Sequence, residues 1–180
     1  MKCTVLLALF VACLAGQTPD KDKDKDKLAP YFPTPPSIVL RMLQLTELKK
    51  GEKMFDIGSG DGRIVVMAAK RFGADSTGVE LDESLCRFSV GEIKRQKLEK
   101  TAKIVCADAA KQDYSPADVI TIYLLPEFNA KLRPILEKQL KKGTRIVAHD
   151  FEFEGWKADK IEHVEDDGEG RSHTIFVYRR

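Results

Sequence analysis

The sequence predicts an α/β fold whose central sheet is mostly parallel, has about seven strands and carries helices on both faces. The first observation is that short apolar runs of strand length alternate with helix-like segments from residue 54 onward. The second is a glycine-rich turn that joins the first of these strands to the next helix. The third is that the first three strands each end at an acidic residue. Because ligands of parallel sheets bind at the carboxyl ends of the strands, the sequence predicts a site at this edge.

Length, charge and residue content narrow the function classes. The chain has 180 residues and a net charge of +2, which suits one domain with its own core and implies no general attraction to nucleic acid or acidic membranes. Cys106 lies in an apolar strand and Cys86 in a helix pattern, so we predict buried thiols rather than a disulfide. His149, His163 and His173 lie far apart, and no Cys/His group has zinc-site spacing. We therefore expect no metal site.

The N-terminal residues differ from the rest of the chain. Residues 1–16 contain an apolar run of about fourteen residues, which as a helix reaches roughly 21 Å and favours a signal peptide or another membrane-targeting segment over a permanent span. The four residues ending at Cys13 are similar to a lipoprotein cleavage box, which would allow acylation there. Residues 17–27 are rich in alternating Asp and Lys and predict a solvated linker. The folded domain is then residues 28–180.

The domain begins with a proline-rich stretch, residues 31–36, which is predicted to be extended because proline restricts itself and the residue before it. Ser37 is then expected to cap a helix. Its buried face is predicted to carry Ile38, Val39, Met42, Leu43 and Leu45. Two lysines and Gly51 are typical of its C-terminal end.

The most informative segment is residues 54–63, with the sequence MFDIGSGDGR. A strand ends near Asp56, glycines follow at positions 58, 60 and 62, and a helix is predicted over residues 64–72. A dinucleotide fingerprint would need a third glycine at position 63, where Arg63 stands instead. The spacing therefore favours a different nucleotide-like ligand, and a glycine turn without a ligand is the alternative.

Two further acidic residues also lie at the ends of predicted strands. Glu80 ends a second strand about twenty residues after the turn, the distance at which a βαβ unit places a carboxylate against two ribose hydroxyls. Asp82 is expected to cap the following helix. Asp108 lies just past the end of a third strand that is predicted within residues 102–109. An exposed strand-end residue at Glu80 and a turn aspartate at Asp108 are the structural alternatives.

The second half of the chain continues the alternation. A fourth strand (117–126), a helix (127–140), a fifth strand (144–150) and two last strands (159–165 and 173–179) are predicted in this order. Pro134 is expected to kink or restart the helix. Only about eight residues are available between the fifth and sixth strands. The helix there is expected to be reduced or absent.

Five segments together carry a resemblance to a known family. They are residues 31–35, 56–63, 78–82, 123–127 and 143–149. In order and spacing they resemble class I S-adenosylmethionine (SAM)-dependent methyltransferases, and more narrowly the small protein-lysine N-methyltransferases of the ATP synthase c subunit and the adenine nucleotide translocase. The resemblance covers residues 28–180 and implies a Rossmann-like sheet.

The resemblance also implies a cofactor, SAM, and a set of residues around it. The residues expected to bind SAM are Tyr31, Thr34, Asp56, Gly58, Ser59, Gly60, Gly62, Glu80 and Asp108. In this scheme Asp56 orients the amino-acid end, Glu80 the ribose and Asp108 the adenine amino group. Tyr31 and Thr34 either close over the methionine moiety or form only a rigid lead into the first helix.

The acceptor side is expected where the fourth strand ends. By the resemblance, Tyr123, Leu124 and Pro126 shape the acceptor channel. Glu127 either attracts a cationic amine, and serves as the catalytic base, or is an ordinary acid in the first turn of a helix. Tyr123, Pro126 and Glu127 are the predicted catalytic residues.

Three functions follow from this resemblance. The first is methyl transfer to a protein lysine; the second is methylation of a small or lipid-linked amine or hydroxyl of the cell envelope; the third is a SAM-binding scaffold without turnover. The partner is thus a protein or small-molecule acceptor, with no nucleic acid, and with membrane proximity through residues 1–16. An export signal would separate the enzyme from SAM, which is made and held in the cytosol. The domain is therefore exported or envelope-associated where SAM is also present, or anchored with the domain in the cytoplasm, or the signal is not functional.

Overall fold

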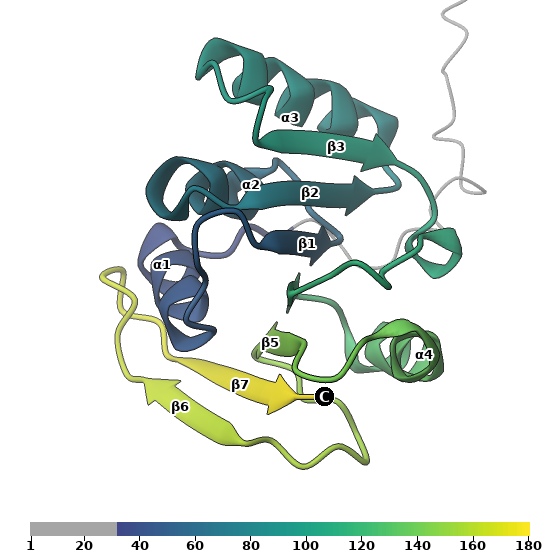
Figure 1. Ribbon diagram of the computed structural model, residues 1–180. Coiled ribbons are helices and arrows are strands. Elements are labelled where there is room, and N and C mark those ends of the chain that lie inside the picture. Colours follow the sequence, from purple (N-terminus) through teal and green to yellow (C-terminus); the bar gives the residue numbers. More distant parts are fainter. Residues whose placement is uncertain (1–31) are drawn as a thin grey trace, which may run out of the picture.

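The structure is a computed structural model in which residues 32–180 are described (Figure 1). The predicted targeting segment (1–16), Cys13, the linker (17–27) and Tyr31 lie outside the described residues.

One sheet forms the centre of the molecule. Its strands are β1 (Lys53–Ile57), β2 (Asp75–Glu80), β3 (Ala102–Cys106), β4 (Val119–Ile122), β5 (Arg145–His149), β6 (Lys160–Val164) and β7 (His173–Arg179). They lie in the order β3-β2-β1-β4-β5-β7-β6. The first five strands are parallel, while β7 runs antiparallel to both β5 and β6. This confirms the predicted seven-stranded, mostly parallel sheet.

Helices cover both faces of the sheet. They are α1 (Pro36–Leu45), α2 (Arg63–Met67), the π-helical turn η1 (Ala68–Phe72), α3 (Glu83–Arg95), the 3₁₀ turn η2 (Ala109–Lys111) and α4 (Pro126–Gln139). Figure 1 shows α1 and α4 on opposite sides of the strands. The predicted helix over residues 64–72 is therefore α2 continued by a π turn.

Successive apolar side chains of the central strands alternate between the two faces of the sheet and form a hydrophobic core on each face. In β1, Met54 packs with α1 and α2, while its neighbour Phe55 packs on the α4 side. β4 repeats the pattern with Val119 on the first face and Ile120 on the second. Successive side chains of a strand point to opposite faces, so each of these strands supplies both cores. β4 is buried throughout, and β1 is buried except at Lys53.

Helix starts and interiors differ in detail from the prediction. Ser37 does not cap α1: Pro35 holds the cap position, and the Ser37 hydroxyl donates to the carbonyl oxygen of Asp167 at 2.7 Å. The helix begins earlier because a proline fits its first turn, where no amide partner is needed. Asp82 caps α3 as predicted, accepting hydrogen bonds from two backbone amides of the first turn. α4 runs through Pro134 as one helix, so no restart occurs.

The connection from β5 to β6 has no helix, as predicted, because residues 150–159 form only bends and turns. Phe153 is buried here and stacks on Trp156, with ring centroids 4.6 Å apart. The Trp156 indole N–H donates to Glu137 of α4 at 2.7 Å. Within residues 32–180, none of the helices has the length and apolar character that crossing a bilayer requires.

Candidate active site

The glycine turn follows β1 directly and leads into α2. Gly58 and Gly62 have φ angles of +75° and +77°, a region that L side chains rarely adopt. A Cβ atom on Gly58 would lie 2.7 Å from Leu124 Cδ2. The Gly58 amide donates to the Val79 carbonyl oxygen at 2.9 Å, which holds the turn against β2. The turn is therefore compact, with bare backbone where the strands end.

Asp56 lies in β1 just before the turn and is almost completely buried. Its Oδ1 accepts a hydrogen bond from the Thr121 hydroxyl of β4 at 2.6 Å. Its Oδ2 and the buried Ser59 hydroxyl have no hydrogen-bond partner among residues 32–180. Burial raises the pKa of Asp56 to about 7, and the nearby carboxylates of Glu80 and Asp61 act in the same direction. Two buried polar groups without partners indicate a place for a polar ligand, since such groups are normally satisfied.

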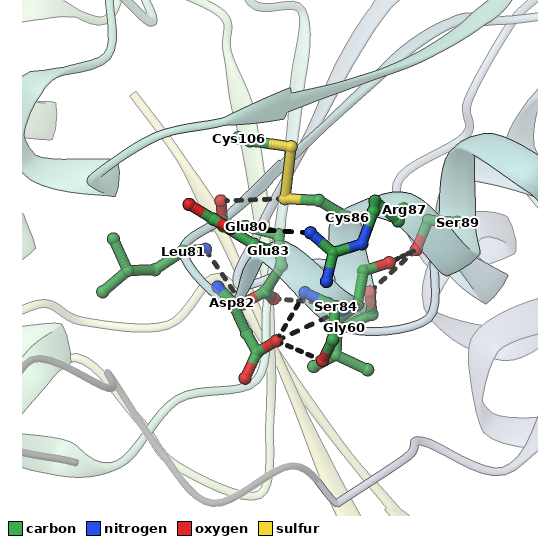
Figure 2. Close-up of a disulfide and its surroundings, with 11 residues drawn as sticks. Gly60, Glu80, Leu81, Asp82, Glu83, Ser84, Cys86, Arg87, Ser89 and Cys106 are labelled. Carbon is green, nitrogen blue, oxygen red and sulfur yellow. Dashed lines mark hydrogen bonds and ion pairs between the residues drawn. A yellow bond between two sulfur atoms is a disulfide. The ribbon is translucent and has the colours of Figure 1, made fainter. Parts of the chain in front are cut away.

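Glu80 ends β2 and ties the strand to the glycine turn (Figure 2). Its Oε2 accepts from the Gly60 amide at 2.8 Å, and its Oε1 accepts from the amides of Leu81 and Asp82, each at 2.9 Å. A carboxylate has about four lone-pair positions. Three backbone bonds thus fix the side chain and leave it able to accept from a further donor.

A disulfide joins Cys86 of α3 to Cys106 at the end of β3 (Figure 2). The prediction of two buried thiols is therefore wrong. The two Cα atoms are 5.9 Å apart, because α3 returns the chain to the strand beside β2. Periodicity places each cysteine in its own element but does not show that the two face each other. The bridge lies close to Glu80, whose carbonyl oxygen is 3.5 Å from Cys86 Sγ.

Asp108 lies two residues beyond β3, at the same edge of the sheet as Asp56 and Glu80. Its side chain accepts from the Ala110 amide at 2.9 Å and caps η2. It also lies 3.5 Å from the Lys111 ammonium, and about a third of the side chain is exposed. The structure thus shows a capping role for a carboxylate that is partly exposed to solvent.

The proline-rich stretch before α1 reaches the same edge. The Thr34 carbonyl oxygen accepts from Arg63 Nη1 at 3.0 Å, so the first residue of α2 holds this stretch against the glycine turn. The Thr34 hydroxyl lies 3.2 Å from His149 Nδ1 and is buried. Thr34 therefore links the cofactor side of the predicted site to the end of β5.

The predicted acceptor residues follow β4. Tyr123 is half-buried, and its ring centroid lies 4.0 Å from that of His149 and 6.1 Å from that of Phe151. Burial and the Asp150 carboxylate raise the pKa of Tyr123. Tyr123 thus forms an aromatic cluster with His149 and Phe151. Pro126 and Glu127, in contrast, are exposed in the first turn of α4.

The structure adds residues that the sequence analysis did not assign to the site. Thr121 is the hydroxyl partner of Asp56, Arg63 binds the Thr34 carbonyl, and His173 of β7 lies against His149. One signal in the sequence pointed to Arg63, because it occupies the position where a dinucleotide-binding motif has its third glycine. The other two come from strands whose neighbours only the three-dimensional pairing reveals.

Comparison with known proteins shows which family has a similar sequence. Residues 56–160 match the ANTKMT methyltransferase domain. The chain is 39% identical to a protein-lysine N-methyltransferase of Saccharolobus islandicus over 83% of this chain and 92% of that protein. It is 31% identical to the human lysine N-methyltransferase of the ATP synthase c subunit over 83% of this chain and 60% of that protein.

The chain belongs to the ANTKMT methyltransferase family. Among solved structures, an RNA methyltransferase from Salinibacter ruber in complex with S-adenosyl-L-homocysteine (SAH) is 38% identical, with a TM-score of 0.76 over 82% of this chain and 93% of that one. The fold is therefore the Rossmann-like class I methyltransferase fold, the protein is a methyltransferase, and SAM is its cofactor. This confirms the fold, enzyme class and cofactor predicted from the sequence.

The residues of this chain fit such a cofactor. The unpartnered Asp56 Oδ2 is an acceptor suited to an ammonium group, and the glycine turn has no side chain that would fill the adjoining space. Glu80 is fixed by backbone amides and still able to accept from hydroxyl groups. These acceptors suit the ammonium group and the ribose hydroxyls of an amino acid joined to a nucleoside.

Proposed function

We propose that this protein transfers a methyl group from SAM to the ε-amino group of a lysine in a protein substrate. One observation carries the proposal: 39% identity to a protein-lysine N-methyltransferase that extends over 92% of that protein. The likeness thus spans the strand ends of the acceptor side as well as the glycine turn.

We infer the following roles for the residues of the site. Asp56 holds the amino group of the cofactor, and Glu80 accepts from its ribose hydroxyls. Asp108, whose carboxylate is partly exposed, accepts from the adenine amino group. The turn at Gly58, Ser59, Gly60 and Gly62, together with Thr34 and with Tyr31 outside the described residues, completes the cofactor side.

The acceptor side works by placement and exclusion of water. When bound, SAM supplies a methyl group on a sulfonium, which a neutral amine takes by in-line displacement. A lysine has a pKa near 10.4 in water, and removal from water lowers it. Tyr123, stacked with Phe151 and buried against His149, offers such a dehydrated wall. Pro126 and Glu127 border its solvent side, where Glu127 attracts the cationic lysine as it approaches.

The test is a labelling experiment with the purified full chain, labelled SAM and a cell extract. We expect label in protease-sensitive material and methyl-lysine after acid hydrolysis. Tyr123→Phe should bind SAM like the wild type but transfer methyl roughly 10-fold to 100-fold more slowly, the equivalent of one charge-assisted hydrogen bond. Binding without transfer in the wild type would instead make the protein a scaffold, and label in solvent-extractable material would indicate a small or lipid-linked acceptor.

RNA methylation is the second candidate, favoured by the Salinibacter structure described as an RNA methyltransferase. Charge argues against it, because 30 basic and 28 acidic residues leave a net charge of only +2, whereas binding to phosphate backbones depends on excess positive charge. The same labelled reaction separates the two: ribonuclease would release the label from RNA and leave label in protein untouched.

We also propose that residues 1–16 direct the chain to the cell envelope. The Cys86–Cys106 disulfide supports this, because disulfides persist in oxidising compartments. Fractionation of the native host, with mass spectrometry of the N-terminal peptide, tests it. Recovery of Met1 in the cytosolic fraction would contradict the proposal, and an acylated Cys13 would identify a lipoprotein.

A further inference from the structure

Two histidines and an aspartate meet where β5 ends and β7 begins. The antiparallel pairing of β5 with β7 brings His149 and His173 together across 24 residues of sequence. His149 Nε2 lies 2.9 Å from His173 Nδ1, His173 Nδ1 lies 3.1 Å from Asp150 Oδ2, and Asp150 Oδ2 lies 3.3 Å from His149 Nε2. Three potential ligand atoms thus form one triangle with nearly equal sides.

We propose that His149, Asp150 and His173 form a binding site for a divalent transition-metal ion of the zinc type. Atoms bound at about 2.1 Å to one metal ion lie roughly 3.0 Å apart in an octahedral site and about 3.4 Å apart in a tetrahedral one. The three observed separations fall at or within about 0.1 Å of this range. Two imidazoles and one carboxylate suit zinc or ferrous iron better than magnesium or calcium, which prefer oxygen ligands alone.

The outer atoms of the same residues are held in place. His149 Nδ1 lies 3.2 Å from the Thr34 hydroxyl, and His173 Nε2 lies 3.3 Å from Oδ2 of the buried Asp167 carboxylate. The second oxygen of Asp150 accepts from the Thr174 amide at 2.9 Å. In metal sites, the ring nitrogen of a histidine that does not bind the metal usually contacts a carboxylate or another polar group, and this contact fixes the orientation of the ligand.

The outer contacts of the two rings suit this role. A ring proton on His173 Nε2 can be donated to the Asp167 carboxylate, and one on His149 Nδ1 can be donated to the Thr34 hydroxyl. Nδ1 of His173 and Nε2 of His149 then each present a lone pair to the triangle, beside the Asp150 carboxylate oxygen.

Access and backbone geometry agree with a site. The side chains of His149 and His173 are 0% and 5% exposed, while that of Asp150 is 25% exposed and leaves a path from solvent. Asp150 also has a φ of +58°, a left-handed conformation that aspartate tolerates better than most residues. The sequence predicted no metal site because the histidines are distant from one another in sequence. The pairing of β5 with β7 nevertheless brings His149 and His173 together in the fold.

The inference is tested with the full chain after treatment with a chelator. Titration with Co²⁺, followed by its visible absorption, should show one equivalent bound, and Zn²⁺ should displace it. Asp150→Asn keeps the size of the side chain and suits the left-handed backbone, but should abolish binding of one equivalent. Asp167→Asn, which removes the carboxylate behind His173, should weaken binding about 10-fold to 100-fold.

The matched control is His163→Ala, because His163 is the third histidine and lies on β6, where its Nδ1 is 3.1 Å from the Thr174 hydroxyl. It should bind Co²⁺ like the wild type. Circular dichroism of each variant checks that it is folded, and His173→Gln provides a second substitution of the β7 ligand. The inference is overturned if the wild type binds no stoichiometric Co²⁺ or Zn²⁺, or if Asp150→Asn and His173→Gln are folded and bind as well as His163→Ala.

Discussion

At the scale of single residues, Asp56 combines almost complete burial with one carboxylate oxygen that has no hydrogen-bond partner within the described part of the chain. Its pKa of about 7 means that the folded protein holds a proton there which the unfolded chain, with an ordinary aspartate, releases near pH 4. The folded state is therefore favoured below pH 4 by this group. The advantage is lost as pH rises through about 7.

The first prediction concerns Asp56→Asn, which cannot ionise. Between pH 4 and pH 7 the free energy of unfolding of the wild type should fall relative to that of the variant, by at most about 4 kcal/mol. Denaturant unfolding at several pH values measures it. Asp75→Asn, which removes an exposed carboxylate from β2, is the control and should follow the wild type. The same Asp56→Asn variant should bind SAM more weakly, and parallel pH profiles for all three proteins would contradict the prediction.

The second prediction concerns Gly58→Ala. The added Cβ would lie 2.7 Å from Leu124 Cδ2, and the residue has a φ of +75°. Gly51→Ala is the matched control, because its φ is +79° but no other atom of residues 32–180 lies within 4 Å of the added Cβ. Both should lose about 1 kcal/mol of stability through backbone strain. Only Gly58→Ala should also lose SAM affinity, as measured by calorimetry; equal affinities in the two variants would show that the close contact has no role.

At the scale of elements, the disulfide joins the start of α3 to the end of β3. The third prediction is that a reducing agent lowers the free energy of unfolding by about 3 kcal/mol, since the bridge closes a loop with a sequence separation of 20 residues. The Cys86→Ser, Cys106→Ser double variant should be insensitive to the agent. Thiol titration in denaturant without reductant should detect Cys3 and Cys13 only; four reactive thiols would contradict the prediction.

At the same scale, the positions of the elements could be predicted from the sequence, but the contacts between them could not. Strand positions and the places of Asp56 and Glu80 could be predicted, because periodicity and the glycine spacing are local and the βαβ unit has a fixed geometry. Which side chains meet between elements could not be predicted. The Cys86–Cys106 bridge depends on how α3 packs, and the meeting of His149 with His173 depends on β7 inserting beside β5. Neither leaves a signal in sequence spacing.

At the scale of the whole molecule, cofactor binding should stabilise the fold. The fourth prediction is that SAM or SAH at about 100 times its Kd adds roughly 2.7 kcal/mol, which raises the unfolding temperature by roughly 5–10 °C. NADH at the same concentration should cause no shift, because Arg63 stands where a dinucleotide site needs a glycine. Thermal unfolding by circular dichroism measures both, and a shift with NADH alone would overturn the assignment of the cofactor.

The position of β7 has a consequence for synthesis of the protein. β7 lies inside the sheet, between β5 and β6, and contributes the buried Val177 and Tyr178 to both cores. A nascent chain therefore keeps β5 as an open edge until residues 173–179 have left the ribosome, and an open edge is able to pair with other chains. Folding is thus completed only after these residues emerge, and a stop codon before residue 173 would leave a product prone to aggregation.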